Sequence, residues 1–344
     1  MHRISAGPTR LSPGIRRGSL LIAALTLATS ASADSSPSAT DLDAFRSAII
    51  SGGPPKDGIP SIDEPQFTSA AAASHLEDDD IVFGIVRNGQ ARAYPRRILA
   101  SHEIVNDRLG GRNLAVTYCP LTATAIGFYR GNTTFGVSGR LVNSNLVMYD
   151  RKTGSYWPQM LATAIKGPRQ GEQLESFPVA WTSWKAWREA HPDTRVMTRN
   201  TGYARDYSRD PYGSYNPLSG YYAPGTSLMF PVMNKDDRLA DKAIVVTALS
   251  PDGALAVDKD RLRSKGAIVI EAGAGHYLAV HDPALETGRI YRLPGGSDVE
   301  PADIGLTAQG LVANGDPVGG ERLIAWDAFW FAWAAFYPQT ALAK

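Results

Sequence analysis

The sequence predicts a β-rich α+β protein that is built from two related lobes of mostly antiparallel strands, each closed by an aromatic helix. Three observations support this class. Glycine-containing turns separate short apolar runs, the pattern of residues 81–99 returns at residues 244–262, and a segment with aromatic residues at helical spacing comes late in each half. Strands joined by short hairpin turns predict antiparallel sheets, and not the alternating strands and helices of a parallel sheet.

The first 33 residues have the pattern of an export signal. Arg10, Arg16 and Arg17 precede the apolar run 20–27, and an A-x-A cleavage site ends at Ala33. The mature protein is therefore expected in the periplasm or outside the cell. No stable membrane anchor is expected, because the apolar run is too short to span a bilayer. The general secretory and twin-arginine routes both stay open.

The composition of the mature chain excludes some partners. Cleavage removes four of the 35 basic residues and none of the 34 acidic ones, which leaves a net charge near −3. Without a basic excess, we expect a small-molecule partner and no nucleic acid. The single cysteine, Cys119, excludes an internal disulfide. A lone thiol in an oxidising compartment is usually buried, bound to a metal or used chemically.

A lead-in at residues 34–75 is rich in Ser, Pro, Ala and Gly. Residues 41–50 are predicted to form a short helix with Asp41 as its N-cap. Residues 51–65 are expected to be extended, because each proline disfavours helix around it.

Lobe one, at residues 76–200, is predicted to consist mostly of strands. Asn88-Gly89 and Gly110-Gly111 are typical of hairpin turns between neighbouring strands. The expected strands cover residues 81–86, 91–94, 104–109, 113–118, 123–129, 133–137 and 145–149. The expected helices cover residues 96–101 and 182–190, the second with Thr182 as its N-cap.

The second half repeats features of the first. Residues 244–262 repeat the order of strand, glycine turn, strand and charged segment seen at 81–99. Both halves end in an aromatic helix followed by x-Pro-x-Thr. The matching pairs are Trp184 with Trp330, Trp187 with Trp333, His191 with Tyr337 and Thr194 with Thr340. We therefore expect a duplication, with a Tyr-rich loop at 201–239 and a degenerate lobe two at 240–344 that serves as a scaffold.

The candidate site lies in lobe one. Cys119 follows the predicted strand 113–118, and His102 stands one hairpin earlier. That hairpin is expected to bring the thiol and the imidazole together. Glu103 would orient the imidazole or accept a proton, although a surface carboxylate is the simpler interpretation.

Polar residues around this pair extend the candidate site. Each has an ordinary structural interpretation, as a turn residue bonded to its own backbone or as a packed side chain. The expected substrate-binding residues are Asn106, Tyr118, Thr122, Ser138, Asn143, Asp150 and Tyr207. Met148 is a candidate soft ligand for copper, with core packing as the alternative.

The motifs HEIVND, YCPLTATA, FGVSGRLVNSNLVMYDR, SYWPQ, HPDT and GYARDYSRDPYGSY resemble the bacterial domain-of-unknown-function family 3179 over about residues 59–340. The resemblance implies an exported or envelope protein with Cys119 and His102 nearly fixed, and it supplies no settled activity. Many relatives resemble YCPLCGTA, whereas this chain has Thr122 in place of the second cysteine. A two-cysteine redox or zinc centre is therefore impossible here.

Three function classes remain open, and the sequence favours the first of them over the two alternatives. The first is a metal or redox site with Cys119, His102 and Met148 as ligands, holding copper or another transition metal, which would keep the thiol reduced. The second is a thiol-nucleophile hydrolase or transferase with Cys119, His102 and Glu103 as catalytic residues. The third is a non-catalytic envelope binding module. The sequence leaves undecided whether the protein is an enzyme, and in which oligomeric state it acts.

Overall fold

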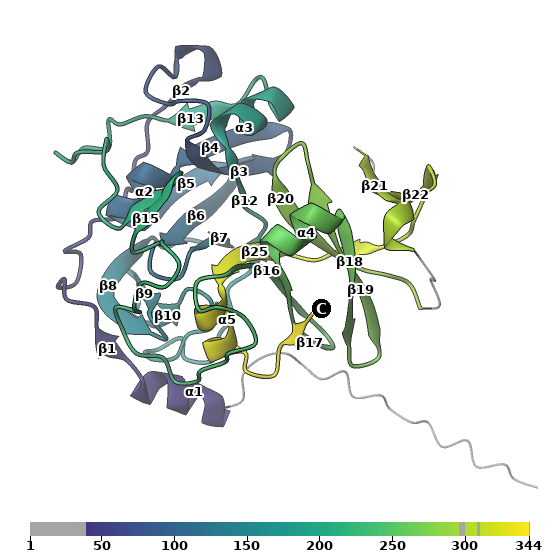
Figure 1. Ribbon diagram of the computed structural model, residues 1–344. Coiled ribbons are helices and arrows are strands. Elements are labelled where there is room, and N and C mark those ends of the chain that lie inside the picture. Colours follow the sequence, from purple (N-terminus) through teal and green to yellow (C-terminus); the bar gives the residue numbers. More distant parts are fainter. Residues whose placement is uncertain (1–38, 296–299, 308–309, 344) are drawn as a thin grey trace, which may run out of the picture. The chain divides into compact units, whose positions relative to one another are not determined.

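The computed structural model describes residues 39–295, 300–307 and 310–343. The predicted export signal lies outside the described residues. Hairpins build this part of the chain (Figure 1). Asn88 and Gly89 both have positive φ, 48° and 74°, and join β3 (Ile81–Arg87) to β4 (Gln90–Pro95). This is the backbone that a tight hairpin requires, and asparagine and glycine adopt it with little strain.

Three sheets make up the first half, in the orders β12-β3-β4-β13-β2, β11-β7-β6-β5 and β1-β8-β9-β10. The further elements are α1 (Ala39–Ser47), β1 (Ile50–Ser51), β2 (Phe67–Ser69), the 3₁₀ helix η1 (Ala70–Ala72), α2 (Arg96–His102), β5 (Ile104–Leu109), β6 (Arg112–Cys119), β7 (Thr124–Tyr129), β8 (Phe135–Val142), β9 (Asn145–Asp150), β10 (Tyr156–Pro158), β11 (Ser176–Phe177), β12 (Ala180–Ser183), α3 (Trp184–Ala190) and β13 (Arg195–Met197).

The second half contains two four-stranded sheets, β25-β16-β17-β26 and β18-β19-β20-β24, and two smaller ones. Its elements are β14 (Gly213–Tyr215), β15 (Leu218–Gly220), β16 (Ile244–Ser250), β17 (Gly253–Asp258), α4 (Lys259–Lys265), β18 (Ala267–Ala272), β19 (Gly275–Asp282), β20 (Thr287–Arg292), the 3₁₀ helix η2 (Pro301–Asp303), β21 (Ile304–Thr307), β22 (Gly310–Ala313), β23 (Asp316–Pro317), β24 (Glu321–Arg322), β25 (Ala325–Phe329), α5 (Trp330–Phe336) and β26 (Ala341–Leu342). Strands far outnumber helices and most pair antiparallel, so the β-rich α+β class is confirmed.

Two of these sheets share one pairing pattern. In each, a central hairpin has an antiparallel neighbour on one side and a parallel neighbour on the other, β12-β3-β4-β13 in the first half and β25-β16-β17-β26 in the second. A short helix follows the antiparallel neighbour in both. In each of these helices the indole nitrogen of a tryptophan donates to the hydroxyl of a threonine seven residues later. The distance is 2.8 Å from Trp187 to Thr194 and 2.9 Å from Trp333 to Thr340.

The main hydrophobic core draws on both halves. All seven residues of α5 are buried, and Trp330 and Trp333 belong to the same core cluster as Tyr118 and Phe128 of β6 and β7. The backbone amide of Phe329 donates to the carbonyl of Thr122 at 2.8 Å. The start of α5 is therefore fixed against the turn that follows Cys119.

Two predicted helices had wrong boundaries. The first helix begins at Ala39 and ends at Ser47, and Ile50 lies in β1, where it pairs with Leu141 of β8. The helix predicted from Thr182 begins at Trp184, because Thr182 is held in β12 by its pairing with Val82. Its N-cap is Ser183, whose hydroxyl accepts from the amide of Ala186. None of the described helices is long and apolar enough to cross a membrane.

Candidate functional site

Cys119 is the last residue of β6, opposite Thr124 across a tight turn, and only 1% of it is exposed. The thiol faces the carbonyl of Ser144 at 3.8 Å, and the backbone amide of Leu146 donates to Sγ at 3.3 Å. The sulfur is therefore set between the end of β6 and the turn that joins β8 to β9. Burial raises the pKa of the thiol to about 12.

Glu103 follows α2 directly, and its carboxyl group is buried. Among the described residues, no hydrogen bond or ion pair reaches this carboxyl group, and burial raises its pKa to about 8. The negative charge of Glu103 is the second cause of the raised pKa of Cys119, so the two side chains lie within electrostatic range of each other. A buried acid without a partner is costly, and perturbed acids of this kind concentrate at functional sites.

Strained backbone surrounds the thiol. Nine described residues other than glycine have a positive φ, and four of them lie in the three turns that meet at Cys119. They are Glu103 (58°), Ala123 (51°), Asn143 (50°) and Ser144 (60°). Such conformations cost on the order of 1–3 kcal/mol each, and they persist where the surrounding structure forces them, commonly at functional sites.

A network of buried polar side chains includes Thr122 and Thr124, which lie in and just after the turn that follows Cys119. Gln159 accepts hydrogen bonds from Thr124 at 2.8 Å and from Asn145 at 2.9 Å, and it donates to Thr117 at 2.8 Å. Asn145 also donates to Thr122 at 2.9 Å. All five side chains are fully buried and bonded, so Thr122 and its neighbours fix β6, β7 and β9 in one register.

The segment 201–239, which we name the tyrosine cover, lies over the thiol. Tyr221 donates from its hydroxyl to the carbonyl of Leu121 at 2.9 Å, and Ser144 donates to the carbonyl of Phe230 at 2.9 Å. The charge of Cys119 adds to burial in raising the pKa of both Tyr212 and Tyr221. The cover therefore closes the sulfur from solvent.

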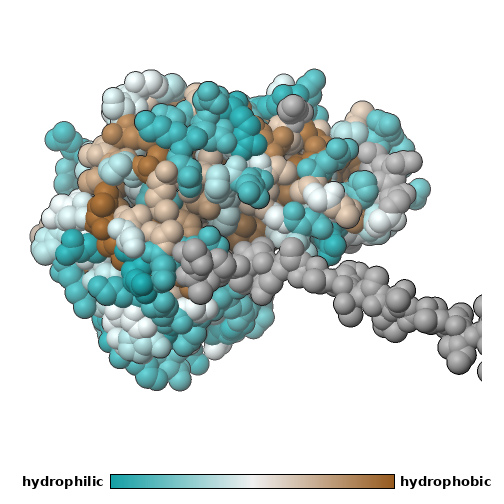
Figure 2. Space-filling model, turned by 90° about the horizontal axis from the view of Figure 1, so that it is seen from below, coloured by the Kyte–Doolittle hydropathy of each residue, from teal (hydrophilic) through white to brown (hydrophobic). Residues whose placement is uncertain are grey.

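Little regular structure holds the tyrosine cover in place. Its two strands, β14 and β15, have three residues each and pair only with one another. Leu218, Met229 and Met233 of the cover are among the exposed large hydrophobic residues of the described chain. Figure 2 shows hydrophobic residues, in brown, between hydrophilic ones on one face of the molecule. Side-chain packing holds the cover instead, since Tyr207 and Tyr222 belong to the main hydrophobic core.

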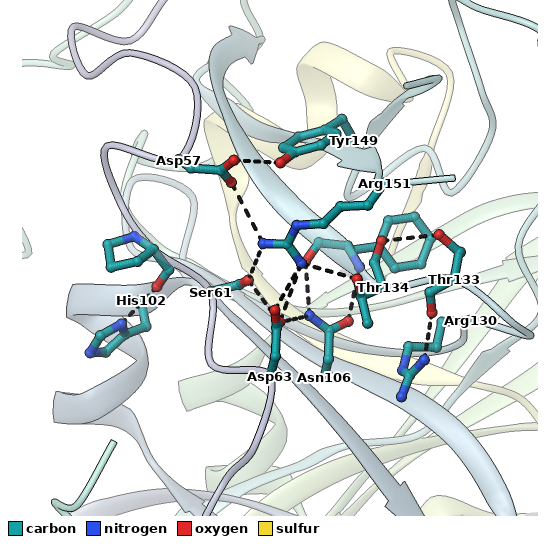
Figure 3. A network of polar contacts seen from close by, with 12 residues as sticks. Asp57, Ser61, Asp63, His102, Asn106, Arg130, Thr133, Thr134, Tyr149 and Arg151 are labelled. Carbon is teal, nitrogen blue, oxygen red and sulfur yellow. Dashed lines mark hydrogen bonds and ion pairs between the residues drawn. The ribbon is translucent and has the colours of Figure 1, made fainter. Parts of the chain in front are cut away.

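Both ring nitrogens of His102 are bonded to groups other than the thiol. Its Nδ1 lies 2.7 Å from the carbonyl of Pro60 and its Nε2 lies 2.6 Å from the hydroxyl of Tyr207, which bonds in turn to Thr201 at 2.6 Å. Because a carbonyl only accepts, Nδ1 carries the proton and Nε2 accepts from Tyr207. Burial lowers the pKa of His102. The expected thiol–imidazole hydrogen bond is not formed, and His102 instead ties α2 to the lead-in (Figure 3). Its other ring nitrogen ties α2 to the cover through Tyr207.

Arg151 is the centre of a second network, which anchors the lead-in (Figure 3). Its guanidinium reaches Asp63 at 3.1 Å and Ser61 at 2.9 Å. Asn106 donates to Asp63 at 2.7 Å, and its amide exchanges two further hydrogen bonds with the backbone of Phe135. Every polar atom of the Asn106 side chain is thus used inside the protein, which makes it a structural residue in this state.

The remaining predicted site residues lie apart from the thiol or pack around it. Ser138 bonds to the carbonyl of Val147 at a β-bulge, and Asp150 accepts from the indole of Trp157 at 3.1 Å. Asn143 joins the cover to α5 through Met233 and Ala335. The other two are buried in the core, Tyr118 with its hydroxyl 3.4 Å from that of Tyr222, and Met148 inside β9.

No three acidic, histidine or cysteine side chains of the described residues form a group that could hold a metal ion. The predicted ligand set of Cys119, His102 and Met148 gains no support from this arrangement, because His102 uses both ring nitrogens elsewhere.

Sequence reasoning did not find two important contributors. Gln159 occupies the centre of the polar network, and Arg96 forms a buried ion pair with Asp210 of the cover. Arg96 and Asp210 are 114 residues apart, and no spacing rule pairs them. Gln159 lies between the strand predicted at 145–149 and the helix predicted at 182–190, and a glutamine there carries no signal of its own.

A comparison with family models matches residues 56–340 to the family described as "Protein of unknown function (DUF3179)". The chain belongs to this family. The match covers all the elements that build the site, from the lead-in to α5. Comparisons with curated proteins and with solved structures gave no significant match.

Proposed function

We propose that this member of the DUF3179 family is an exported enzyme of acyl transfer, a hydrolase or transferase, with Cys119 as the nucleophile and Glu103 as the general base. One observation carries the proposal: an unpartnered buried carboxyl group lies within electrostatic range of the only thiol of the chain, where three strained turns meet. Buried acids without partners, lone thiols and strained turns are each costly. Because all three occur together here, a reactive site is the simplest reason for the protein to keep them.

The chemistry requires both groups. When the cover opens, the Glu103 carboxylate accepts the proton of the Cys119 thiol as Sγ attacks the carbonyl carbon of an ester or amide. The bond between that carbon and the leaving group breaks, and Glu103 returns the proton to the leaving oxygen or nitrogen. The resulting thioester then passes its acyl group to water or to a second nucleophile, and the thiol is restored.

Glu103 suits the role of base better than His102 does. Both ring nitrogens of His102 are bonded within the protein, whereas the carboxyl group of Glu103 has no partner among the described residues. His102 then acts as a positioning residue, since it holds the end of α2, from which Glu103 projects.

We also infer that the two halves are copies of one unit and that lobe two is a scaffold. The shared pairing pattern and the matched tryptophan–threonine hydrogen bonds support the duplication. Only the first half holds the thiol, and α5 of the second half packs behind it. An exported location agrees with this arrangement, because a thiol closed under the cover resists oxidation.

Acylation of the folded protein tests the proposal. We expect p-nitrophenyl acetate to add one acetyl group at Cys119, detected by intact mass and peptide mapping, with none on Cys119→Ala. Glu103→Gln should slow this acylation at least tenfold at pH 8, whereas Glu189→Gln, which changes an exposed glutamate, should match the parent protein.

Iodoacetamide separates the base role from a purely electrostatic one. Replacing Glu103 removes a negative charge that raises the pKa of the thiol, so alkylation of Glu103→Gln above pH 8 should be faster than that of the parent. Slower acylation together with faster alkylation supports a general base. Labelling of Cys119 only after unfolding in urea would overturn the proposed function.

A further inference from the structure

The tyrosine cover brings an acidic side chain onto a buried arginine. Arg96 is the first residue of α2 and is 5% exposed. Its guanidinium forms an ion pair with Asp210 of the cover, whose side chain is 3% exposed. Asp210 also accepts from the backbone amide of Tyr212 at 2.8 Å and from the hydroxyl of Tyr222 at 3.0 Å.

Asp210 does not satisfy all the hydrogen-bond donors of Arg96. Its Nε is buried and has no hydrogen-bond partner among the described residues, and the ion pair with Asp210 runs through a single nitrogen, Nη1. The rings of Tyr215 and Tyr222 lie 4.9 Å and 5.5 Å from the guanidinium carbon. The guanidinium therefore lies beside a stacked pair of tyrosine rings and keeps a free donor at Nε, and an arginine with a free donor can hold a carboxylate through two parallel hydrogen bonds.

The arginine site and the thiol site share the same cover. Tyr212 has its amide bonded to Asp210, and the charges of Glu103 and Cys119 both contribute, after burial, to the raised pKa of its phenol. A movement of this segment that uncovers the thiol therefore also withdraws Asp210 from Arg96. A buried arginine left without an anion is costly, so the open state favours a ligand that brings its own carboxylate.

We propose that Arg96 binds the carboxylate of the acyl substrate, and that Asp210 occupies this place while the cover is closed. The substrate class is then an ester or amide that carries a free carboxylate. This inference rests on the proposed function, and it names the substrate class for the same site. One ion pair breaks and an equivalent one forms, so exchange of Asp210 for the substrate keeps the net charge of the buried site unchanged.

Paired alkylating reagents test the inference. Iodoacetate and iodoacetamide transfer similar groups to a thiol, and only the first carries a carboxylate. We compare the ratio of their rates at Cys119 in the parent protein, in Asp210→Asn and in the charge-neutral pair Arg96→Gln/Asp210→Asn. The ratio should rise in Asp210→Asn, where Arg96 is left unpaired, and fall about tenfold in the double variant. Acetate should compete and acetamide should not.

The outcomes separate the two proposals. Labelling by both reagents with the same ratio in Asp210→Asn and in the double variant overturns carboxylate binding by Arg96 and leaves the thiol proposal intact. If neither reagent labels the folded protein, the thiol proposal fails. Carboxylate binding by Arg96 is then tested in variants that lack the thiol. In Cys119→Ala/Asp210→Asn, acetate but not acetamide should raise the melting temperature, and this shift should vanish when Arg96→Gln is added. Its absence from Cys119→Ala/Asp210→Asn would overturn the assignment of Arg96.

Discussion

Replacing Glu103 with glutamine should make the protein more stable, and the gain should grow as the pH rises. The pKa of this carboxyl group is about 8 in the folded protein, against an ordinary value of 4.5. The folded state therefore holds the proton more tightly than the unfolded chain does. Its stabilising contribution is complete below pH 4.5 and is lost as the pH rises through about 8.

The magnitude follows from the two pKa values. At about 1.4 kcal/mol for each pH unit, the full interval from 4.5 to about 8 corresponds to about 5 kcal/mol. Between pH 5.5 and pH 8.5 the parent protein should lose about 3 kcal/mol of this contribution to its free energy of unfolding. Glutamine has nearly the same shape and no charge, so Glu103→Gln should lose none of it.

Urea unfolding at pH 5.5 and 8.5, followed by tryptophan fluorescence, measures the effect. The difference in the free energy of unfolding between Glu103→Gln and the parent should widen by about 3 kcal/mol over this range. Glu189→Gln is the matched control, since Glu189 is exposed, and its difference should stay constant. An equal difference at both pH values for Glu103→Gln would show that the carboxyl group is solvated or paired, and the argument for the site would fail with it.

Three further substitutions test the surroundings of the site. Gly84→Ala would place a methyl carbon 2.2 Å from the ring of Trp187, so unfolding by urea should show a loss of about 1–3 kcal/mol. Gln159→Leu would leave three buried polar groups without their partner, and the same measurement should show a loss of about 2–4 kcal/mol. Burial lowers the pKa of His102, so its contribution to stability is present above pH 6.5 and is lost on acidification. His102→Gln should therefore lose less stability than the parent between pH 7.5 and 5, and an equal loss would refute the buried neutral imidazole.

The sequence predicts the strands of the first half well because their turns carry a local signal. The strand expected at 104–109 is β5 exactly, and Gly110 and Gly111 both have the positive φ that the hairpin needs. Helix ends are less well predicted, since pairing with a distant strand decides them. Thr182 is a good N-cap by type, but its pairing with Val82 moves the cap to Ser183.

The sequence predicts the segment in which the candidate site is placed, and it does not predict which side chains contact one another there. The segment around Cys119 stands out because many polar residues interrupt strand-like runs. Glu103 has a positive φ, and glutamate gives no sequence signal of that conformation. His102 lies one residue earlier and bonds to the lead-in and the cover instead.

The proposed exported location would place a lone thiol in an oxidising compartment, where the burial of Cys119 protects it. Oxidants attack the thiolate, and with a pKa of about 12 only about one thiol in 10⁵ is ionised at pH 7. The same burial keeps Glu103 protonated, because its pKa of about 8 lies above neutral pH. In the proposed mechanism the cover opens and water reaches the pair, which should lower the pKa of the carboxyl group toward 4.5 and that of the thiol toward 9. Under this proposal, opening creates a carboxylate base and a more acidic thiol in one step, so that protection of the sulfur and its activation would be two states of one equilibrium.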